Sequence, residues 1–212
     1  MQEPPDILIS VDESLPASWA QECADSVAAP SLDMIIDRPK PGGLQAGPEL
    51  LLATAAFLFL FKSYFDGFLK EAGKDHYQAL KAAISKFWPR FFGKDRLVTT
   101  TVIVSPPGKL TPGPRYSSTF SLMAESTRRR RFKLLIPDNA SFEEFEASTE
   151  AFLQFMQAQH SGQDLDTSTR ALVESPDTYG LVLVTYDPAT KSLHGIDFMT
   201  GAPRLPSAGE SE

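Results

Sequence analysis

Residues 50–61 have the sequence LLLATAAFLFLF, a run of apolar residues without a single charge. A helix needs about 20 apolar residues to span a bilayer core, and shorter apolar runs are more often buried or interfacial helices. This run is therefore too short to be a transmembrane helix by itself. If it is helical, it is apolar on every face and must be buried somewhere. Which surface buries it is the main question that the sequence raises about function.

The sequence predicts that this run opens a long helical region over residues 49–92. Apolar residues continue to recur at spacings of three and four after the run, and charged residues fall mainly on the opposite face. An interruption is expected near Gly67 or Gly73. Half of the chain's Phe, Tyr and Trp residues lie between residues 50 and 92, and lysines accompany them.

Three environments suit such a helix. It could pack internally under a sheet, dock on another protein or a second copy of the chain, or lie in a membrane interface with its lysines near the headgroups. The residues predicted to make the contact are Phe57, Phe59, Phe61, Lys62, Phe65 and Lys70.

The N-terminal segment predicts a small βαβ-like unit. Residues 7–11 (ILISV) and 32–36 are aliphatic and strand-like, and a short helix to about Val27 separates them. Asp12 and Asp37 follow the two strands, so parallel pairing would bring both carboxylates to one edge of the sheet. Two carboxylates there could bind Mg²⁺ and position a phosphate. The alternative is that Asp12 leads into the helix and Asp37 opens the Pro/Gly-rich linker at residues 38–48.

After residue 97 the pattern changes to strands. Residues 98–104, 116–123 and 132–136 predict three antiparallel strands, and residues 180–198 predict a β-hairpin. Ser141 and Glu144 match a capping box ahead of a helix to about Gln159. The predicted fold is therefore a single α+β domain over residues 1–202. It combines the βαβ-like unit, the long aromatic-rich helix and a mainly antiparallel C-terminal sheet with one packed helix. A disordered acidic tail is expected at residues 203–212.

Arg128, Arg129, Arg130 and Arg131 form the densest basic cluster of the chain, in a predicted turn. Guanidinium groups can bind phosphate or carboxylate through two parallel hydrogen bonds. An exposed, solubilising turn is one interpretation. Binding of a phosphate, a lipid headgroup or an acidic partner is the other.

Composition narrows the classes of function and partner. The 212 residues carry a formal charge of −7, which argues against a general nucleic-acid binder. The single cysteine, Cys23, excludes an internal disulfide, and the acidic N-terminus lacks the features of a signal peptide. We therefore expect a cytoplasmic protein, with a peripheral location at the membrane as the variant.

Motifs for catalysis are absent from the sequence. The three histidines lack zinc-type spacing, and there is no Walker A, EF-hand or G-x-S-x-G motif. No cofactor is predicted. The sequence thus favours a non-enzymatic interaction protein that uses residues 49–92 and the basic turn, with an anionic membrane surface as the alternative to a protein partner. A small Mg²⁺-dependent enzyme or phosphate-binding module that uses Asp12 and Asp37 is the second hypothesis.

Overall fold

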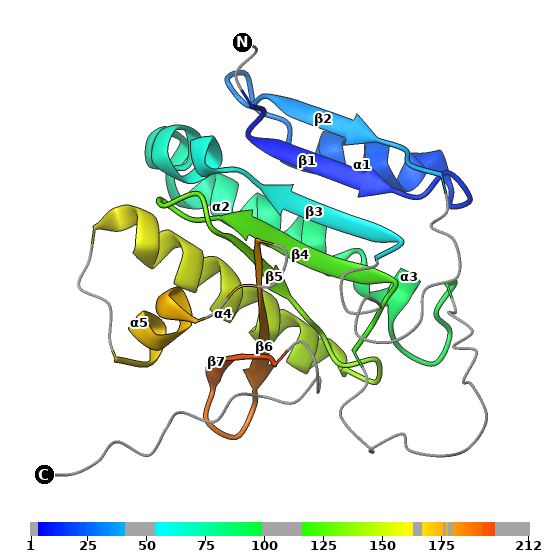
Figure 1. Ribbon diagram of the computed structural model, residues 1–212. Coiled ribbons are helices and arrows are strands. Elements are labelled where there is room, and N and C mark those ends of the chain that lie inside the picture. The colour runs from blue at the N-terminus through cyan, green and yellow to red at the C-terminus, as the bar shows by residue number, and fades with distance from the viewer. Residues whose placement is uncertain are drawn as a thin grey trace, which may run out of the picture.

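The computed structural model describes residues 4–40, 54–98, 116–162, 167–175, 177 and 180–197. Its centre is a seven-stranded mixed sheet in the order β2-β1-β3-β4-β5-β6-β7, with α1, α2 and α4 packed on one face (Figure 1). The strands are β1 (Ile7–Val11), β2 (Met34–Asp37), β3 (Ala56–Leu60), β4 (Phe120–Glu125), β5 (Arg131–Leu134), β6 (Leu181–Asp187) and β7 (Ser192–Gly195). The helical elements are α1 (Ala17–Val27), the π-helical turn η2 (Tyr64–Phe68), α2 (Leu69–Ser85), α3 (Trp88–Phe91), α4 (Phe142–Ser161) and α5 (Thr167–Glu174). Helices and a mixed sheet confirm the predicted α+β class.

The predicted N-terminal βαβ unit is confirmed. Strands β1 and β2 are parallel and in register from Ile7 opposite Met34 to Ser10 opposite Asp37, and α1 lies between them in the chain. The buried side of α1 includes Trp19, Cys23 and Val27. The unit does not stand alone, because β1 also pairs with β3 and so joins the rest of the sheet.

The prediction of a helix from residue 49 is wrong over the described part of the apolar run. Residues 56–60 form β3, a central strand that is antiparallel to β1 and parallel to β4. A short, wholly apolar segment cannot be assigned to strand or helix from periodicity alone, because both faces are covered in either case. Helical structure begins only after Phe61 and runs through η2 and α2, with a kink at Gly73, where φ is 69°. Residues 49–53 lie outside the described residues.

The antiparallel pairing predicted for the C-terminal half is present in two strand pairs, but these two pairs do not form one continuous antiparallel sheet. Strands β4 and β5 are antiparallel, and β6 and β7 form an antiparallel hairpin. Strands β5 and β6 are parallel, however, with α4 and α5 between them in the chain. The predicted capping box of α4 is confirmed: the Ser141 hydroxyl accepts from Glu144 N, and the Glu144 carboxylate accepts from Ser141 N. Except for Val98, the predicted strand 98–104 lies outside the described residues, as do linker residues 41–48 and the tail.

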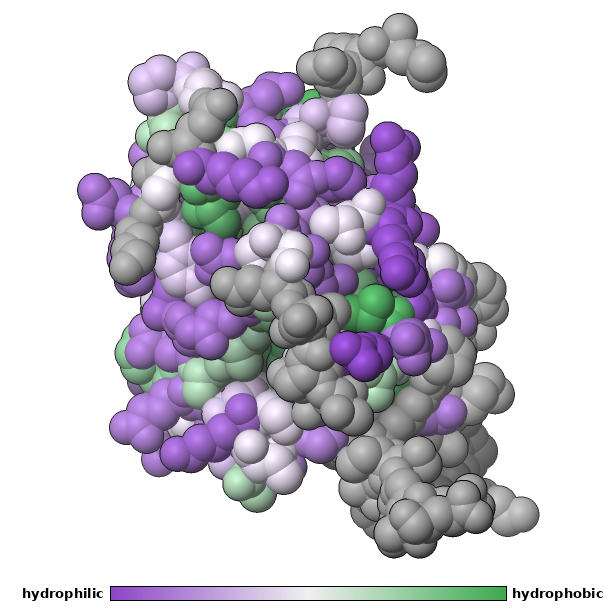
Figure 2. Space-filling model, turned by 90° about the vertical axis from the view of Figure 1, so that its left-hand side faces the viewer, coloured by the Kyte–Doolittle hydropathy of each residue, from purple (hydrophilic) through white to green (hydrophobic). Residues whose placement is uncertain are grey.

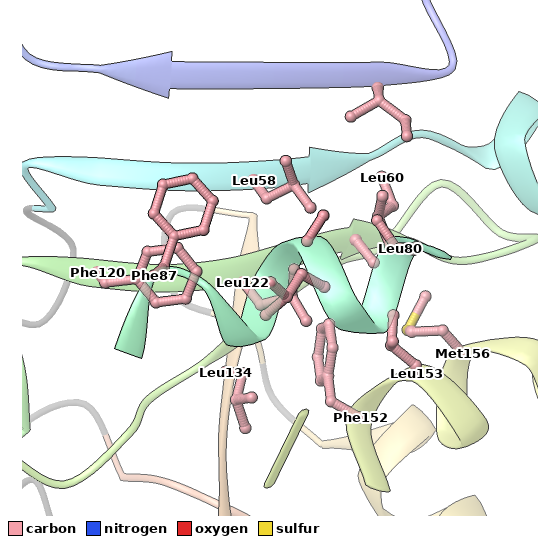
Figure 3. Close-up of a cluster of buried hydrophobic side chains, with 14 of the residues drawn as sticks. Leu58, Leu60, Leu80, Phe87, Phe120, Leu122, Leu134, Phe152, Leu153 and Met156 are labelled. Carbon is pink, nitrogen blue, oxygen red and sulfur yellow. The ribbon is translucent and has the colours of Figure 1, made fainter. Parts of the chain in front are cut away.

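The hydrophobic core lies between the sheet and the helices. Leu58 and Leu60 of β3, Phe120 and Leu122 of β4 and Phe152 of α4 converge there (Figure 3). The ring of Phe120 stacks on the rings of Phe87 and Phe91, with centroids 5.1 and 5.6 Å apart. The even-numbered residues of β3 therefore face the helices, and its odd-numbered residues face the other side of the sheet.

Candidate functional site

Three of the predicted contact residues lie on the face of the sheet opposite the helices. Phe57 and Phe59 alternate with the core residues of β3, so they point away from α2. Phe61 directly follows the strand, and its ring lies 4.5 Å from that of Phe59. Phe59 is 7% exposed, whereas Phe57 and Phe61 are half-buried. The three phenylalanines thus share one surface, but it belongs to a sheet and not to a helix.

Strand register extends this surface into a row that crosses the sheet. Phe59 lies opposite Leu8 of β1 and Met123 of β4, and Leu8 lies opposite Ile35 of β2. On the other side of Met123 the row continues to Lys133 of β5. Side chains directly opposite each other on neighbouring strands are close enough to interact. The row therefore runs from the edge strand β2 across β1, β3 and β4 to β5.

The remaining predicted helix residues do not join this surface. Lys62 forms an ion pair with Asp66 within the first helical turns, and Lys70 is exposed. Phe65 is buried, and its ring stacks on that of His160 with centroids 4.8 Å apart. Phe65 is therefore a core residue, and the two lysines do not line the sheet face.

His160 is a structural residue at the end of α4. Its Nδ1 lies 2.7 Å from Asp66 Oδ1 and its Nε2 lies 2.9 Å from the carbonyl oxygen of Glu125. Both ring nitrogens are therefore engaged by partners within the protein. Partial burial would raise the pKa of Asp66, but hydrogen bonds from Lys62 and His160 outweigh it and hold that pKa below its usual value. With both nitrogens engaged, His160 is not placed to move a proton to or from a ligand.

The four arginines of the basic turn have different environments. The Arg130 guanidinium donates to the carbonyl oxygens of Val173 and Ser175 at the end of α5, so Arg130 fastens that helix to the sheet. Arg128, Arg129 and Arg131 are exposed. The side of the molecule where β4 ends is shown in Figure 2, and most of its visible surface is hydrophilic. The turn therefore offers three exposed guanidiniums.

Asp12 and Asp37 lie at the same end of the parallel pair β1 and β2, where the sequence predicted them. The Asp12 carboxylate accepts hydrogen bonds from both the backbone N (2.8 Å) and the hydroxyl (2.6 Å) of Ser14, and it shapes the turn into α1. Asp37 is exposed. Among the described residues, no three acidic, His or Cys side chains are grouped so that they could hold a metal ion. Asp12 thus has the turn-forming role that was the alternative to metal binding.

The edge strand β2 carries features that the sequence analysis missed. Ile35 is 45% exposed and Ile36 is 37% exposed, although both are large apolar residues in a strand. The carbonyl oxygen of Asp33 accepts from Ile7 N of β1. Since backbone groups alternate in direction along a strand, Met34 and Ile36 direct their N–H and C=O groups away from β1. Within the described part of the chain, no strand pairs with that outer side.

Lys133 is the second feature that the sequence did not single out. Lys133 is only 1% exposed, and its Nζ donates a hydrogen bond to Thr54 Oγ1 at 2.6 Å. The same Thr54 oxygen lies 3.2 Å from Ser121 Oγ. Burial lowers the pKa of Lys133 from 10.5 to about 7. A buried lysine with such a pKa is a candidate for acid–base chemistry, but structural residues can be perturbed in the same way. A catalytic role would also need a cavity beside the amine.

The described residues line a surface depression of about 780 Å³ that does not include Lys133. It lies between Trp88 and residues 93–96 and 138–141. Arg96 pairs with Asp138 at 2.8 Å, and Trp88 Nε1 donates to the Ala140 carbonyl oxygen at 3.3 Å. The depression therefore gives no access to the buried amine, and several of its own polar groups are already paired.

Comparisons of the chain with protein-family models, with curated proteins and with solved structures found no match. In the part of the chain that the structure describes, no helix has the length and apolar character needed to cross a bilayer.

Proposed function

We propose that this chain is a non-enzymatic, cytoplasmic interaction protein that binds an extended segment of a partner protein along the outer edge of β2. The exposure of Ile35 and Ile36 on that edge carries the proposal. Sheet edges with unpaired backbone groups accept an added strand, and exposed apolar side chains on such an edge favour the addition. Main-chain hydrogen bonds would supply affinity, and the side chains of β2 would select the partner.

The apolar row on the sheet supports the same site. A residue opposite Ile35 on an added strand would lie at the end of the row formed by Ile35, Leu8, Phe59 and Met123. Cross-strand pairs of this kind contribute about 0.2–1 kcal/mol each relative to alanine pairs. The predicted contact residue Phe59 would therefore support the site from two strands away instead of touching the partner.

A different protein suits this edge better than a second copy of the chain. Symmetric antiparallel pairing of two β2 strands centred on Ile35 would place Asp33 of each copy opposite Asp37 of the other. Like charges directly opposite each other destabilise a strand pair. Self-association of β2 in this register is therefore disfavoured, and a partner with another sequence is favoured in it.

The first test selects ten-residue peptides from a displayed random library on the full-length protein. Hydrogen exchange then follows the backbone amides of Met34 and Ile36 with and without a selected peptide. We expect both amides to become protected on binding, because each would donate to the added strand. The proposal would be overturned if no peptide bound above background, or if bound peptides left both amides unprotected.

Substitution of Ile35 should weaken binding of the selected peptides. A lysine at this position breaks the apolar row where the partner meets it, and we expect Ile35→Lys to lower affinity about tenfold. Leu97→Lys is the matched control, since Leu97 is 70% exposed but lies outside the sheet. Fluorescence anisotropy with a labelled peptide measures both. Equal losses in the two variants would contradict a specific role for the β2 edge.

An anionic membrane is the second candidate partner, and the exposed Arg128, Arg129 and Arg131 favour it. Membrane-bound amphipathic helices combine basic residues with an immersed apolar face, and Phe57 and Phe59 are not on a helix. We therefore expect little flotation of the protein with phosphatidylserine vesicles at 0.15 M salt. At that ionic strength, the attraction between exposed arginines and lipid headgroups is largely screened unless apolar contacts add to it. Salt-sensitive flotation that Arg128→Glu/Arg129→Glu abolishes would favour the membrane.

The magnesium hypothesis is the weaker alternative, because the Asp12 carboxylate is already engaged by Ser14. Asp12→Ala should lower the melting temperature equally with and without Mg²⁺. Stabilisation by Mg²⁺ that is lost in Asp12→Ala would restore that hypothesis.

A further inference from the structure

We infer that the segment added to β2 has three apolar residues between two basic ones, an inference that rests on the proposed function. The five residues from Asp33 to Asp37 have the sequence DMIID, so acidic side chains flank three apolar ones. An added strand in register would place one residue opposite each of them. Its chemistry would then complement the edge as basic, apolar, apolar, apolar and basic.

The two acidic side chains lie on the same face as Ile35. Side chains alternate along a strand, so Asp33, Ile35 and Asp37 share the face opposite the helices. Both carboxylates belong to exposed residues, and neither forms an ion pair with another described residue. The carboxylate of Asp6 lies beside Asp33, because it accepts from Asp33 N at 3.0 Å. This end of the edge is therefore acidic, in a chain whose net charge is −7.

Arg38, the basic residue that follows Asp37 in the chain, does not neutralise this pattern. The Arg38 guanidinium donates to the carbonyl oxygens of Glu13 (3.0 Å) and Leu15 (2.6 Å), which lead into α1. Alternation also places Arg38 on the helix side of the sheet, away from Asp37. Lys40 lies beyond the end of β2. The face that an added strand would meet thus presents negative charge at both ends.

The central residues require apolar partners on both sides of the added strand. Met34 packs against the core and Ile36 lies on the α1 side, whereas Ile35 lies on the opposite side. An added strand in which polar and apolar residues alternate would place polar side chains either against Ile35 on one side of the sheet or against Met34 and Ile36 on the other. The complementary pattern is the same in both chain directions, so the rule holds for parallel and antiparallel addition.

The test uses three synthetic peptides with the core Lys-Val-Ile-Val-Lys, Gln-Val-Ile-Val-Gln or Glu-Val-Ile-Val-Glu and identical capped threonine ends. Anisotropy measures their affinity for the full-length protein. We expect the lysine peptide to bind at least tenfold more tightly than the glutamate peptide, with glutamine between them, because two cross-strand charge pairs change from attractive to repulsive. The difference should shrink in 0.5 M salt. The variant Asp33→Lys/Asp37→Lys should reverse the order of the peptides.

The outcomes separate this inference from the function on which it rests. Equal affinity for the three peptides, with Met34 and Ile36 amides protected, would overturn the charge rule and leave strand addition intact. Tighter binding of the glutamate peptide would overturn the rule as well. If no peptide, synthetic or selected, bound at this edge, the proposed function itself would fail.

Discussion

Leu58→Ala should lower the free energy of unfolding by about 2–5 kcal/mol, the range for removing a buried leucine side chain from a core. Leu58 is 1% exposed and points toward α2 from the central strand β3 (Figure 3). Phe57→Ala, one residue earlier, should cost less than half as much, although it removes a larger side chain. Phe57 is half-buried and faces the other side of the sheet. Urea unfolding of both variants measures the difference.

This pair of variants tests directly whether residues 56–60 form a strand or the helix that the sequence predicted. On a surface helix that docks on a partner or a membrane, Leu58 would be exposed in the isolated protein and its truncation would cost little. Two neighbouring strand residues on opposite faces should instead differ sharply. Equal small losses in both variants would contradict a central strand at residues 56–60. Phe120→Ala on the neighbouring strand provides a positive control for core damage, since Phe120 is 1% exposed.

The sequence contained a signal for β3 that the helical prediction overlooked. In residues 56–61, AFLFLF, phenylalanine occupies every odd position after residue 56 and leucine the even ones between them. That period of two is the strand period, and it sorts Phe57 and Phe59 to one face and Leu58 and Leu60 to the other. Both residue types are apolar, so hydropathy hides the alternation and only residue size reveals it. The helical pattern after residue 61 then extended the wrong assignment backwards.

Elements with local signals were predicted well. The capping box at Ser141 fixes the start of α4 with two hydrogen bonds over three residues, and Asp187 marks the turn of the β6–β7 hairpin. The order of the strands depends instead on contacts distant in sequence. Nothing near residues 34–37 indicates that β2 lies at an edge of the sheet, so the exposed edge could not be found before the fold.

Asp33 and Asp37, the acidic residues at the two ends of the β2 edge, can serve two purposes at once. Charged residues on an edge strand commonly prevent unwanted pairing between sheets. On β2 the same charges oppose a second copy of the chain and attract a basic strand, so exclusion and selection arise from one pattern. Ile35 distinguishes this edge from a merely protected one, because a protected edge gains nothing from an exposed isoleucine between its charges.

Lys133 should make the stability of the protein rise between pH 7 and pH 9. The unfolded chain keeps this amine protonated up to a pKa near 10.5, whereas burial lowers the pKa of the folded amine to about 7. Between these values the unfolded state binds more protons, so the free energy of unfolding increases with pH, by about 2 kcal/mol from pH 7 to pH 9. Above pH 9 the gain should stop, because burial raises the pKa of the Cys23 thiol from 9.0 to about 12, which has the opposite effect.

Urea unfolding at pH 7, 8 and 9 measures this rise in the wild type, in Lys133→Met and in Lys70→Met. Methionine has nearly the length of lysine without the amine, so Lys133→Met should be at least as stable as the wild type at pH 7 and should lack the rise. Lys70 is exposed, and Lys70→Met should keep the rise in full. A wild type whose stability does not change over this range would contradict a buried Lys133, and so would a rise that persists in Lys133→Met. In either case the amine would lie in water, and the row of side chains that runs from β2 to β5 would be open to solvent at its inner end.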